Sequence, residues 1–131
     1  MPTFVRWSLW SIVTIAWTAA LVMPISAPTF GDTEEMRSLV RLILSKAAHV
    51  SVYAAWTALT AWLHAPLRVR LFLLMFLMAH AVGTEWAQTF VPPRTGLLRD
   101  AALDQFGILI GVLATFRWWT APDFALSRRA D

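Results

Sequence analysis

Three groups of polar side chains stand at helical spacing within otherwise apolar stretches of the chain. Within each group the residues lie three, four or seven positions apart, which places them on one face of a helix. Side chains of these types can bind an anionic head group, transfer protons or hold a metal ion. The groups are Lys46, His49 and Tyr53; Glu85 and Gln88; and Asp100 and Asp104, with Gln105 beside them.

The expected depth of Glu85 in the membrane indicates which way its side chain faces. Glu85 stands seven residues before Pro92, hence roughly 10 Å inside the end of its helix. A lone carboxylate that deep in a bilayer costs on the order of 3 kcal/mol, and ionisable residues inside a membrane are functional-site hypotheses by default. We therefore expect Glu85 to face other helices and to pair with a cation or a proton. The loop that follows adds Arg94 and Arg99.

The composition indicates that these groups sit in a membrane. Hydrophobic residues make up 58% of the 131 residues and charged residues only 15%. A soluble domain of this size needs more charges on its surface, and it lacks the volume to bury several long apolar runs. The net charge of +3 does not indicate nucleic-acid binding, because the arginines lie in loops and at helix ends. The absence of cysteine excludes disulfides and thiol catalysis.

We predict an all-α, polytopic membrane protein that forms a single domain over residues 1–131. Four apolar runs approach the length of about twenty residues that crosses a bilayer. After the first run, apolar residues recur at helical spacing opposite charged ones, which predicts a short amphipathic interfacial helix, either distinct from the second span or continuous with it. The first run also resembles a secretory signal, but its length and tryptophans favour a retained helix. The predicted bundle of four transmembrane helices has spans at about residues 4–23, 47–63, 71–91 and 101–119.

This topology brings the polar groups together. Span two begins, span three ends and span four begins on the same side of the membrane, so the three groups should meet at one interface. Gly107 and Gly111 lie on the helix face of Asp104 and predict close helix packing. His80 lies apart, in the middle of span three, and is either functional or bonded to a neighbouring backbone. Of the eleven cationic residues, six share the side of the termini, which favours cytoplasmic N- and C-termini.

The same residues resemble the VanZ-like family of bacterial membrane proteins. The segment KAAHVSVY at 46–53 is similar to the family's lysine–histidine–tyrosine segment, and EWAQTFVPPRT at 85–95 to its glutamate–glutamine–proline–arginine signature. The last polar group and the two glycines match the final family segment, so the resemblance covers about residues 40–116. Pro93 stands where glycine is usual in the family. Asp104 stands where asparagine is commoner, and it adds a negative charge to the centre of the groups.

The resemblance implies a four-span protein of the bacterial cytoplasmic (inner) membrane. The family is named for an accessory protein that reduces susceptibility to teicoplanin, a glycopeptide antibiotic that acts on cell-wall precursors. Membrane lipids, a lipid-linked cell-wall precursor or a glycopeptide are therefore the partners that it implies. An oligomer is compatible with the sequence, and nucleic acid is not an expected partner.

Our preferred hypothesis is a non-enzymatic envelope protein that binds an amphiphilic or lipid-linked ligand. The alternative is a membrane-embedded enzyme acting on a lipid or peptide head group, with Glu85 as base and His49 as acid, or with His49, Glu85 and Asp104 holding a divalent metal. No hydrolase signature or obvious nucleophile supports the enzyme, so we expect neither metal nor cofactor. A carrier, or a cluster that only joins helices, also remains open. The expected ligand-binding residues are Lys46, His49, Tyr53, Glu85, Gln88, Arg94, Arg99, Asp100 and Asp104.

Overall fold

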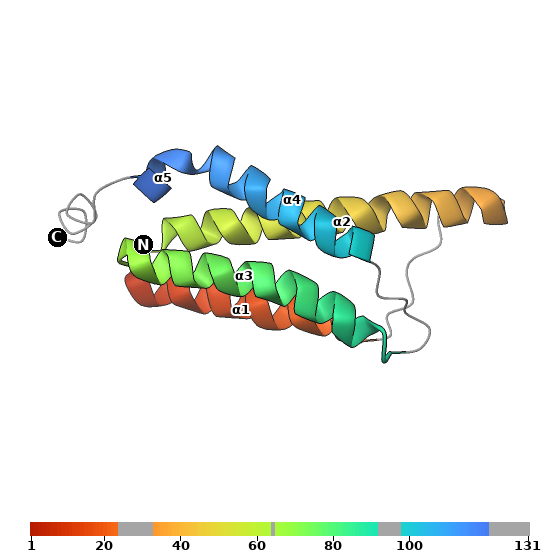
Figure 1. The fold of residues 1–131 in the computed structure, drawn as a ribbon, viewed down its shortest axis with the longest axis horizontal. Coiled ribbons are helices and arrows are strands. Elements are labelled where there is room, and N and C mark those ends of the chain that lie inside the picture. Colours follow the sequence, from red (N-terminus) through yellow and green to blue (C-terminus); the bar gives the residue numbers. More distant parts are fainter. Residues whose placement is uncertain (24–32, 64, 92–97, 121–131) are drawn as a thin grey trace.

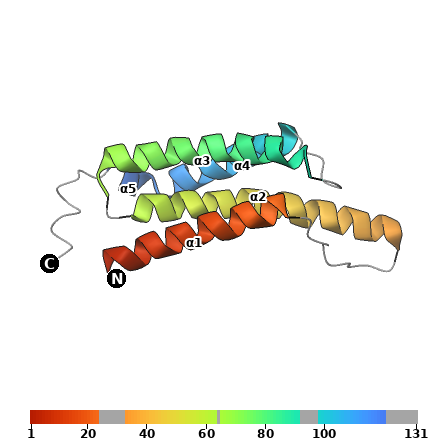
Figure 2. The ribbon, with the colours of Figure 1, turned by 90° about the horizontal axis from the view of Figure 1, so that it is seen from below.

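The computed structural model describes residues 1–23, 33–63, 65–91 and 98–120, and every regular element within those ranges is a helix. Four helices lie along one another, and successive helices run in opposite directions (Figures 1 and 2). The starts of α2 and α4 and the end of α3 therefore share one end of the bundle, as the sequence predicts. The helices are α1 (Thr3–Val22), α2 (Glu34–Trp62), α3 (Leu67–Gln88), α4 (Leu98–Ala114) and the short α5 (Phe116–Thr120).

Three of these helices are long and apolar enough to cross a membrane, which supports the prediction of a multi-pass membrane protein. They are α1, α2 and α3, with 20, 29 and 22 residues. Large apolar side chains such as Ile15, Phe72 and Trp86 are between 64% and 69% exposed on their outer faces, which suits contact with lipid. The predicted fourth span falls on α4, which has only 17 residues before α5 begins, and it stays a prediction.

The segment expected to form a short interfacial helix is continuous with the second span, and its place at the membrane surface stays a prediction. Both belong to α2, which begins after Thr33, whose Oγ1 accepts a hydrogen bond from the Met36 N–H at 3.2 Å. Glu34 lies in the first turn and pairs with Arg41 at 3.1 Å. Residues 33–65 contain neither proline nor glycine, so nothing in the sequence breaks the helix. At about 43 Å, α2 exceeds the roughly 30 Å hydrocarbon core, and its first turns extend beyond the other helices (Figure 1).

Arginines secure the end of the bundle where α1 begins. Arg6 Nη1 donates to the Trp62 carbonyl at 2.8 Å, and its guanidinium lies 4.3 Å from the centroid of the Trp62 ring. Arg70 is fully buried and donates to the Trp118 carbonyl in α5. Carbonyls in the last turn of a helix lack partners in their own helix, and cations near that end are favourable. These two arginines therefore stabilise the C-terminal ends of α2 and α5.

The apolar core lies in the middle of the bundle and is rich in aromatic rings. Trp56 is its largest fully buried side chain, and its ring centroid lies 5.9 Å from that of Trp10 in α1. Tyr53 lies one turn away on α2, with a ring centroid 5.8 Å from that of Trp56. Such ring pairs add to the gain from burial alone. The core thus joins α2 to α1 and α3, with Leu77, Ala81 and Ile108 also buried in it.

The most extensively packed pair of helices is α2 and α4, and two glycines permit their approach. A Cβ added at Gly107 would stand 2.5 Å from the Val50 carbonyl oxygen. One added at Gly111 would stand 2.6 Å from the carbonyl oxygen of Ala54. Because both obstacles are backbone atoms, they cannot move aside as a flexible side chain would. Small residues at these positions let the two backbones meet.

We expect Gly111→Ala to destabilise the protein by about 1–3 kcal/mol, because the added methyl group overpacks the contact between α2 and α4. Unfolding of the purified protein in mixed detergent micelles, followed by circular dichroism, measures the change. Gly83→Ala is the matched control, since a Cβ there meets no atom within 4 Å; it should leave stability unchanged or raise it. Equal stability of Gly111→Ala and the wild type would refute the close packing.

Candidate functional site

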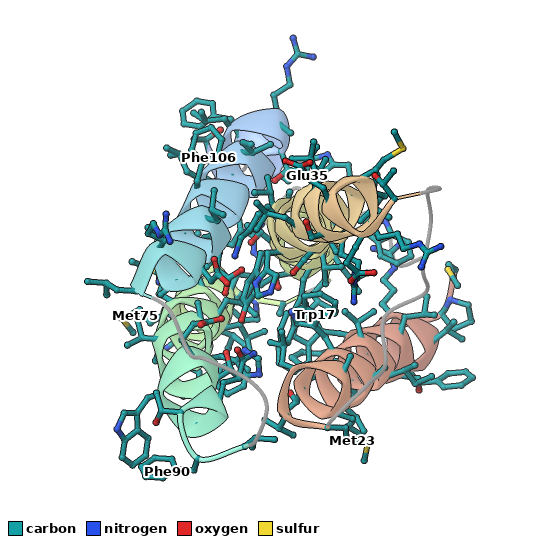
Figure 3. All side chains as sticks on the ribbon, turned by 90° about the vertical axis from the view of Figure 1, so that its right-hand side faces the viewer. Trp17, Met23, Glu35, Met75, Phe90 and Phe106 are labelled. Carbon is teal, nitrogen blue, oxygen red and sulfur yellow. The ribbon has the colours of Figure 1, made fainter. Side chains whose placement is uncertain are left out.

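Polar side chains from all three groups lie together at the end of the bundle where α2 and α4 begin. Five of them are less than 10% exposed, among them His49 at 6%, Glu85 at 5% and Asp104 at 0%. Viewed from this end in Figure 3, nitrogen and oxygen atoms gather between the helices, whereas Phe90 and Phe106 point outward. We call this group the polar cluster. It consists of Lys46, His49, Glu85, Gln88, Asp100 and Asp104.

Two contacts stacked one turn apart join α2 to α4 within the polar cluster. Lys46 Nζ forms an ion pair with Asp100 Oδ1. His49 Nδ1 lies 2.8 Å from Asp104 Oδ1, at hydrogen-bond distance. The spacing i, i+3 on α2 and i, i+4 on α4 explains why the contacts stack, because both intervals make about one helical turn. The side chain of Lys46 is 29% exposed and that of Asp100 11%, so the outer contact is the more accessible one.

Helix α3 adds a carboxylate and an amide to the polar cluster. Glu85 and Gln88 are each 5% exposed and lie one turn apart near the end of the helix. One ligand atom from each of His49, Glu85 and Asp104 lies within 4.8 Å of the others. Asp104 Oδ2 is buried and has no hydrogen-bond partner within the described part of the chain. Three helices therefore bring acid and base groups to one small buried volume.

Two residues expected to bind ligand, Tyr53 and Arg99, are not part of the polar cluster. Tyr53 is fully buried in the core, and its hydroxyl lies 2.9 Å from His80 Nδ1. Arg99 is exposed at the start of α4, and Arg94 lies outside the described residues. Gln105, which adjoins Asp104 in the sequence, donates instead to the Met78 carbonyl of α3 at 2.9 Å. Tyr53 and Gln105 therefore contribute contacts that hold helices together.

His80 connects three helices, a role that its isolated position in the sequence does not reveal. Its Nδ1 lies against the Tyr53 hydroxyl of α2 and its Nε2 lies 2.8 Å from Thr18 Oγ1 of α1. Thr18 uses its own hydrogen to donate to the Thr14 carbonyl at 2.7 Å. The ring must then donate from Nε2 and accept from Tyr53 at Nδ1, which is a neutral tautomer. Both ring nitrogens are satisfied, which assigns His80 a structural role.

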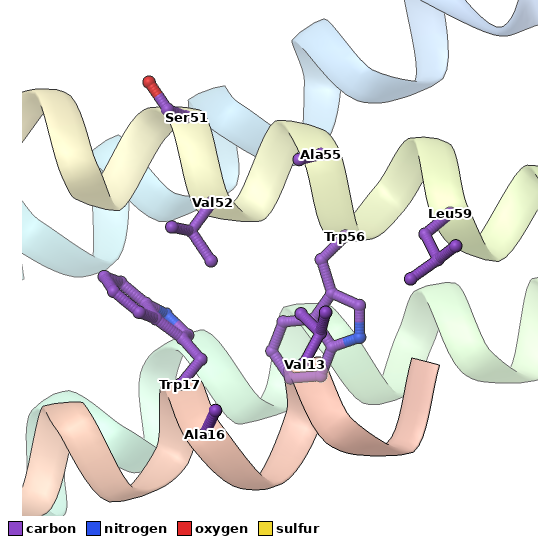
Figure 4. A pocket seen from close by; sticks show the side chains of 8 residues that line it. All are labelled: Val13, Ala16, Trp17, Ser51, Val52, Ala55, Trp56 and Leu59. Carbon is purple, nitrogen blue, oxygen red and sulfur yellow. The ribbon is translucent and has the colours of Figure 1, made fainter. Parts of the chain in front are cut away.

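An apolar groove of about 660 Å³ lies between α1 and α2, beside the polar cluster (Figure 4). Trp17 belongs to its wall, and the Trp17 ring also packs edge-on against the His49 ring, with centroids 5.7 Å apart. The facing positions 16, 51 and 55 are alanine or serine, the one signal in the sequence for space between these helices. The lining residues are Val13, Ala16, Trp17, Ser51, Val52, Ala55, Trp56 and Leu59.

The chemistry available at this end follows from its side chains. The polar cluster contains one ammonium, one imidazole, three carboxylates and one amide, but no serine, threonine or cysteine. Ion pairing, proton transfer and metal ligation are open to such a set. The alternating direction of the helices predicts from the sequence that these residues share one end of the bundle. It does not predict which of them form the contacts, such as that of His49 with Asp104.

We expect Tyr53→Phe to lower stability by about 0.5–1.5 kcal/mol, because it leaves the buried Nδ1 of His80 without a donor. Detergent-micelle unfolding measures the loss. Ser38→Ala is the control, since Ser38 is an exposed residue whose hydroxyl donates to the Glu35 carbonyl of its own helix. In a His80→Phe background the Tyr53→Phe change should cost clearly less. The same loss in both backgrounds would contradict the bond between the two side chains.

Comparisons of the chain with protein-family models, with curated proteins and with solved structures find no match. The resemblance to the VanZ-like family therefore rests on the sequence motifs alone. The geometry itself establishes a helical chain with three helices of membrane-crossing length and a buried polar cluster at one end of the bundle.

Proposed function

We propose that this protein binds one amphiphilic or lipid-linked molecule in the membrane, with the head group at the polar cluster and the hydrocarbon chain in the groove. One observation carries the proposal: Trp17 of the groove also contacts the polar cluster. Its ring lines the groove and packs against His49 of the polar cluster. A ligand with one apolar and one polar part would contact both regions at once.

The groove suits a hydrocarbon chain. Its lining side chains are apolar except for Ser51, and Val13, Val52 and Leu59 supply aliphatic surface. A volume of about 660 Å³ falls within the range of roughly 300–1,000 Å³ that is common for small-molecule sites. Since both helices are long enough to cross a membrane, the groove would lie within the bilayer, where acyl chains are the available apolar partners.

The outer part of the polar cluster suits a phosphate or carboxylate head group. The ammonium of Lys46 is partly exposed beside Asp100, so an anionic group can approach it from the membrane interface. Arg99 is exposed close by at the start of α4 and can add a bidentate contact. The cations Lys46 and Arg99 lie at the outer part of the polar cluster, and the carboxylates of Glu85 and Asp104 lie deeper. An anionic head group would therefore bind at the outer part and stay clear of the buried carboxylates.

The proposed topology includes α4 as the fourth span. Its 17 residues rise about 25 Å, and α5 extends the same end of the chain towards the interface. Arg6, Arg68, Arg70 and Arg117 lie at the end opposite the polar cluster. Loops on the cytoplasmic side of a membrane protein carry an excess of Lys and Arg. If Lys46 is present to bind a ligand and is left out of this comparison, the remaining cationic residues favour the opposite end as the cytoplasmic one. The polar cluster would then face the cell envelope.

The resemblance to the VanZ-like family narrows this proposal further. It favours a lipid-linked cell-wall precursor as the ligand, in the inner membrane of a bacterium, and a link to teicoplanin susceptibility. Within the described part, the family motifs include Lys46, His49, Glu85, Gln88 and Asp100 of the polar cluster, together with Tyr53 of the core. Asp104 departs from the family pattern, in which asparagine is commoner.

An enzyme that acts on the head group is a second candidate, favoured by the meeting of His49, Glu85 and Asp104 within 4.8 Å. In that case Glu85 would act as a general base and His49 as a general acid. Loss of turnover in Glu85→Gln with ligand binding retained would select the enzyme over the binding protein.

We expect Ala55→Trp to reduce the lipid that co-purifies with the protein by at least about tenfold, because the indole fills the groove. Native mass spectrometry of the protein released from mild detergent measures the bound lipid. Ala79→Trp is the matched control, since Ala79 is exposed on α3 and away from the groove. Lys46→Gln should keep the hydrocarbon chain but weaken selection for anionic lipids. Equal lipid retention by the two tryptophan variants would refute the proposed site.

A further inference from the structure

We infer that His49, Glu85 and Asp104 form a binding site for a single divalent transition-metal ion. This inference departs from the sequence-based expectation of no metal, and it does not depend on the binding of an amphiphile. Each of the three residues comes from a different helix, and one ligand atom from each lies within 4.8 Å of the others. Two ligands of a common ion stand at most about 4.2 Å apart, since each bond is about 2.1 Å long. Small side-chain rotations would close the difference.

The carboxylate of Asp104 gives an independent reason to expect a cation. Its Oδ1 faces His49, but Oδ2 is buried without a hydrogen-bond partner in the part of the chain that the structure describes. Asp104 has no exposed surface, so water cannot solvate this oxygen from outside. A buried carboxylate oxygen needs a proton, a donor or a metal ion. The imidazole and the Glu85 carboxylate are already at hand to complete a ligand set.

The ligand types select the class of ion. One imidazole and two carboxylates suit zinc, manganese or iron, whereas magnesium and calcium prefer oxygen ligands alone. A dication with two carboxylates and a neutral imidazole carries no net charge, which favours such a site in a medium of low dielectric constant. The neighbouring Asp100 is held by Lys46 and is therefore kept out of this ligand set.

The test is zinc binding by the purified full-length chain in detergent micelles after treatment with a chelator. Titration calorimetry and elemental analysis should show a single tightly bound zinc ion per chain. Asp104→Asn should weaken zinc binding by at least about 100-fold, because losing a ligand costs at least as much as losing its supporting contacts. Asp100→Asn, one turn away on the same helix, is the matched control for the loss of one charge and should weaken zinc binding far less, because Asp100 is not a ligand.

Two further measurements keep the test decisive. Glu85→Gln removes a ligand from another helix and should weaken zinc binding to a similar extent, so one unstable variant does not decide the outcome. Cobalt added to the folded wild type should give visible absorption bands of nitrogen and oxygen ligation. Failure of the folded wild type to retain zinc would overturn the inference. Equal losses in Asp104→Asn and Asp100→Asn would also overturn it, because the ion would then not sit at these three residues.

Discussion

A bilayer cannot solvate an ionised side chain, and this constraint governs how the helices of this protein are arranged. His49, Glu85 and Asp104 are at most 6% exposed, and they sit on helices whose outer faces are apolar. Each would be costly if it faced lipid. That free-energy cost is reduced where α2, α3 and α4 meet, because there the three side chains can contact one another. The close approach of α2 and α4 at Gly107 and Gly111 makes that meeting point possible.

The two ends of the bundle meet this constraint in different ways. At the end where α1 begins, Arg6 and Arg70 give hydrogen bonds to backbone carbonyls of α2 and α5, so these cations serve the helix ends. In the middle, His80 has both ring nitrogens satisfied by side chains of α1 and α2. At the other end, Asp104 keeps a buried oxygen without a hydrogen-bond partner among the described residues. This last region therefore retains a buried acceptor that can bind something else.

Much of this arrangement could be predicted from the sequence, because apolar run length and alternating helix direction follow from simple rules. Those rules predict four spans, of which three fall on helices of membrane-crossing length, and they predict one shared end for Lys46, Glu85 and Asp104. The sequence left open whether the amphipathic segment forms one helix with the second span, and the structure shows one continuous α2, since no residue between 33 and 65 interrupts it. The partners of His80 and the groove beside Trp17 were missed, because both depend on how helices rotate against one another, which spacing along one helix does not set.

The central claim is that the buried contact between His49 and Asp104 fastens α2 to α4 at the polar cluster. A double-mutant cycle tests it most directly, with His49→Gln, Asp104→Asn and the double variant unfolded in the same micelles after metal removal. A coupling free energy of about 1 kcal/mol or more is expected, since the two side chains lie 2.8 Å apart and are buried. Additive effects of the two changes would contradict the account, because they would mean that the two side chains do not interact.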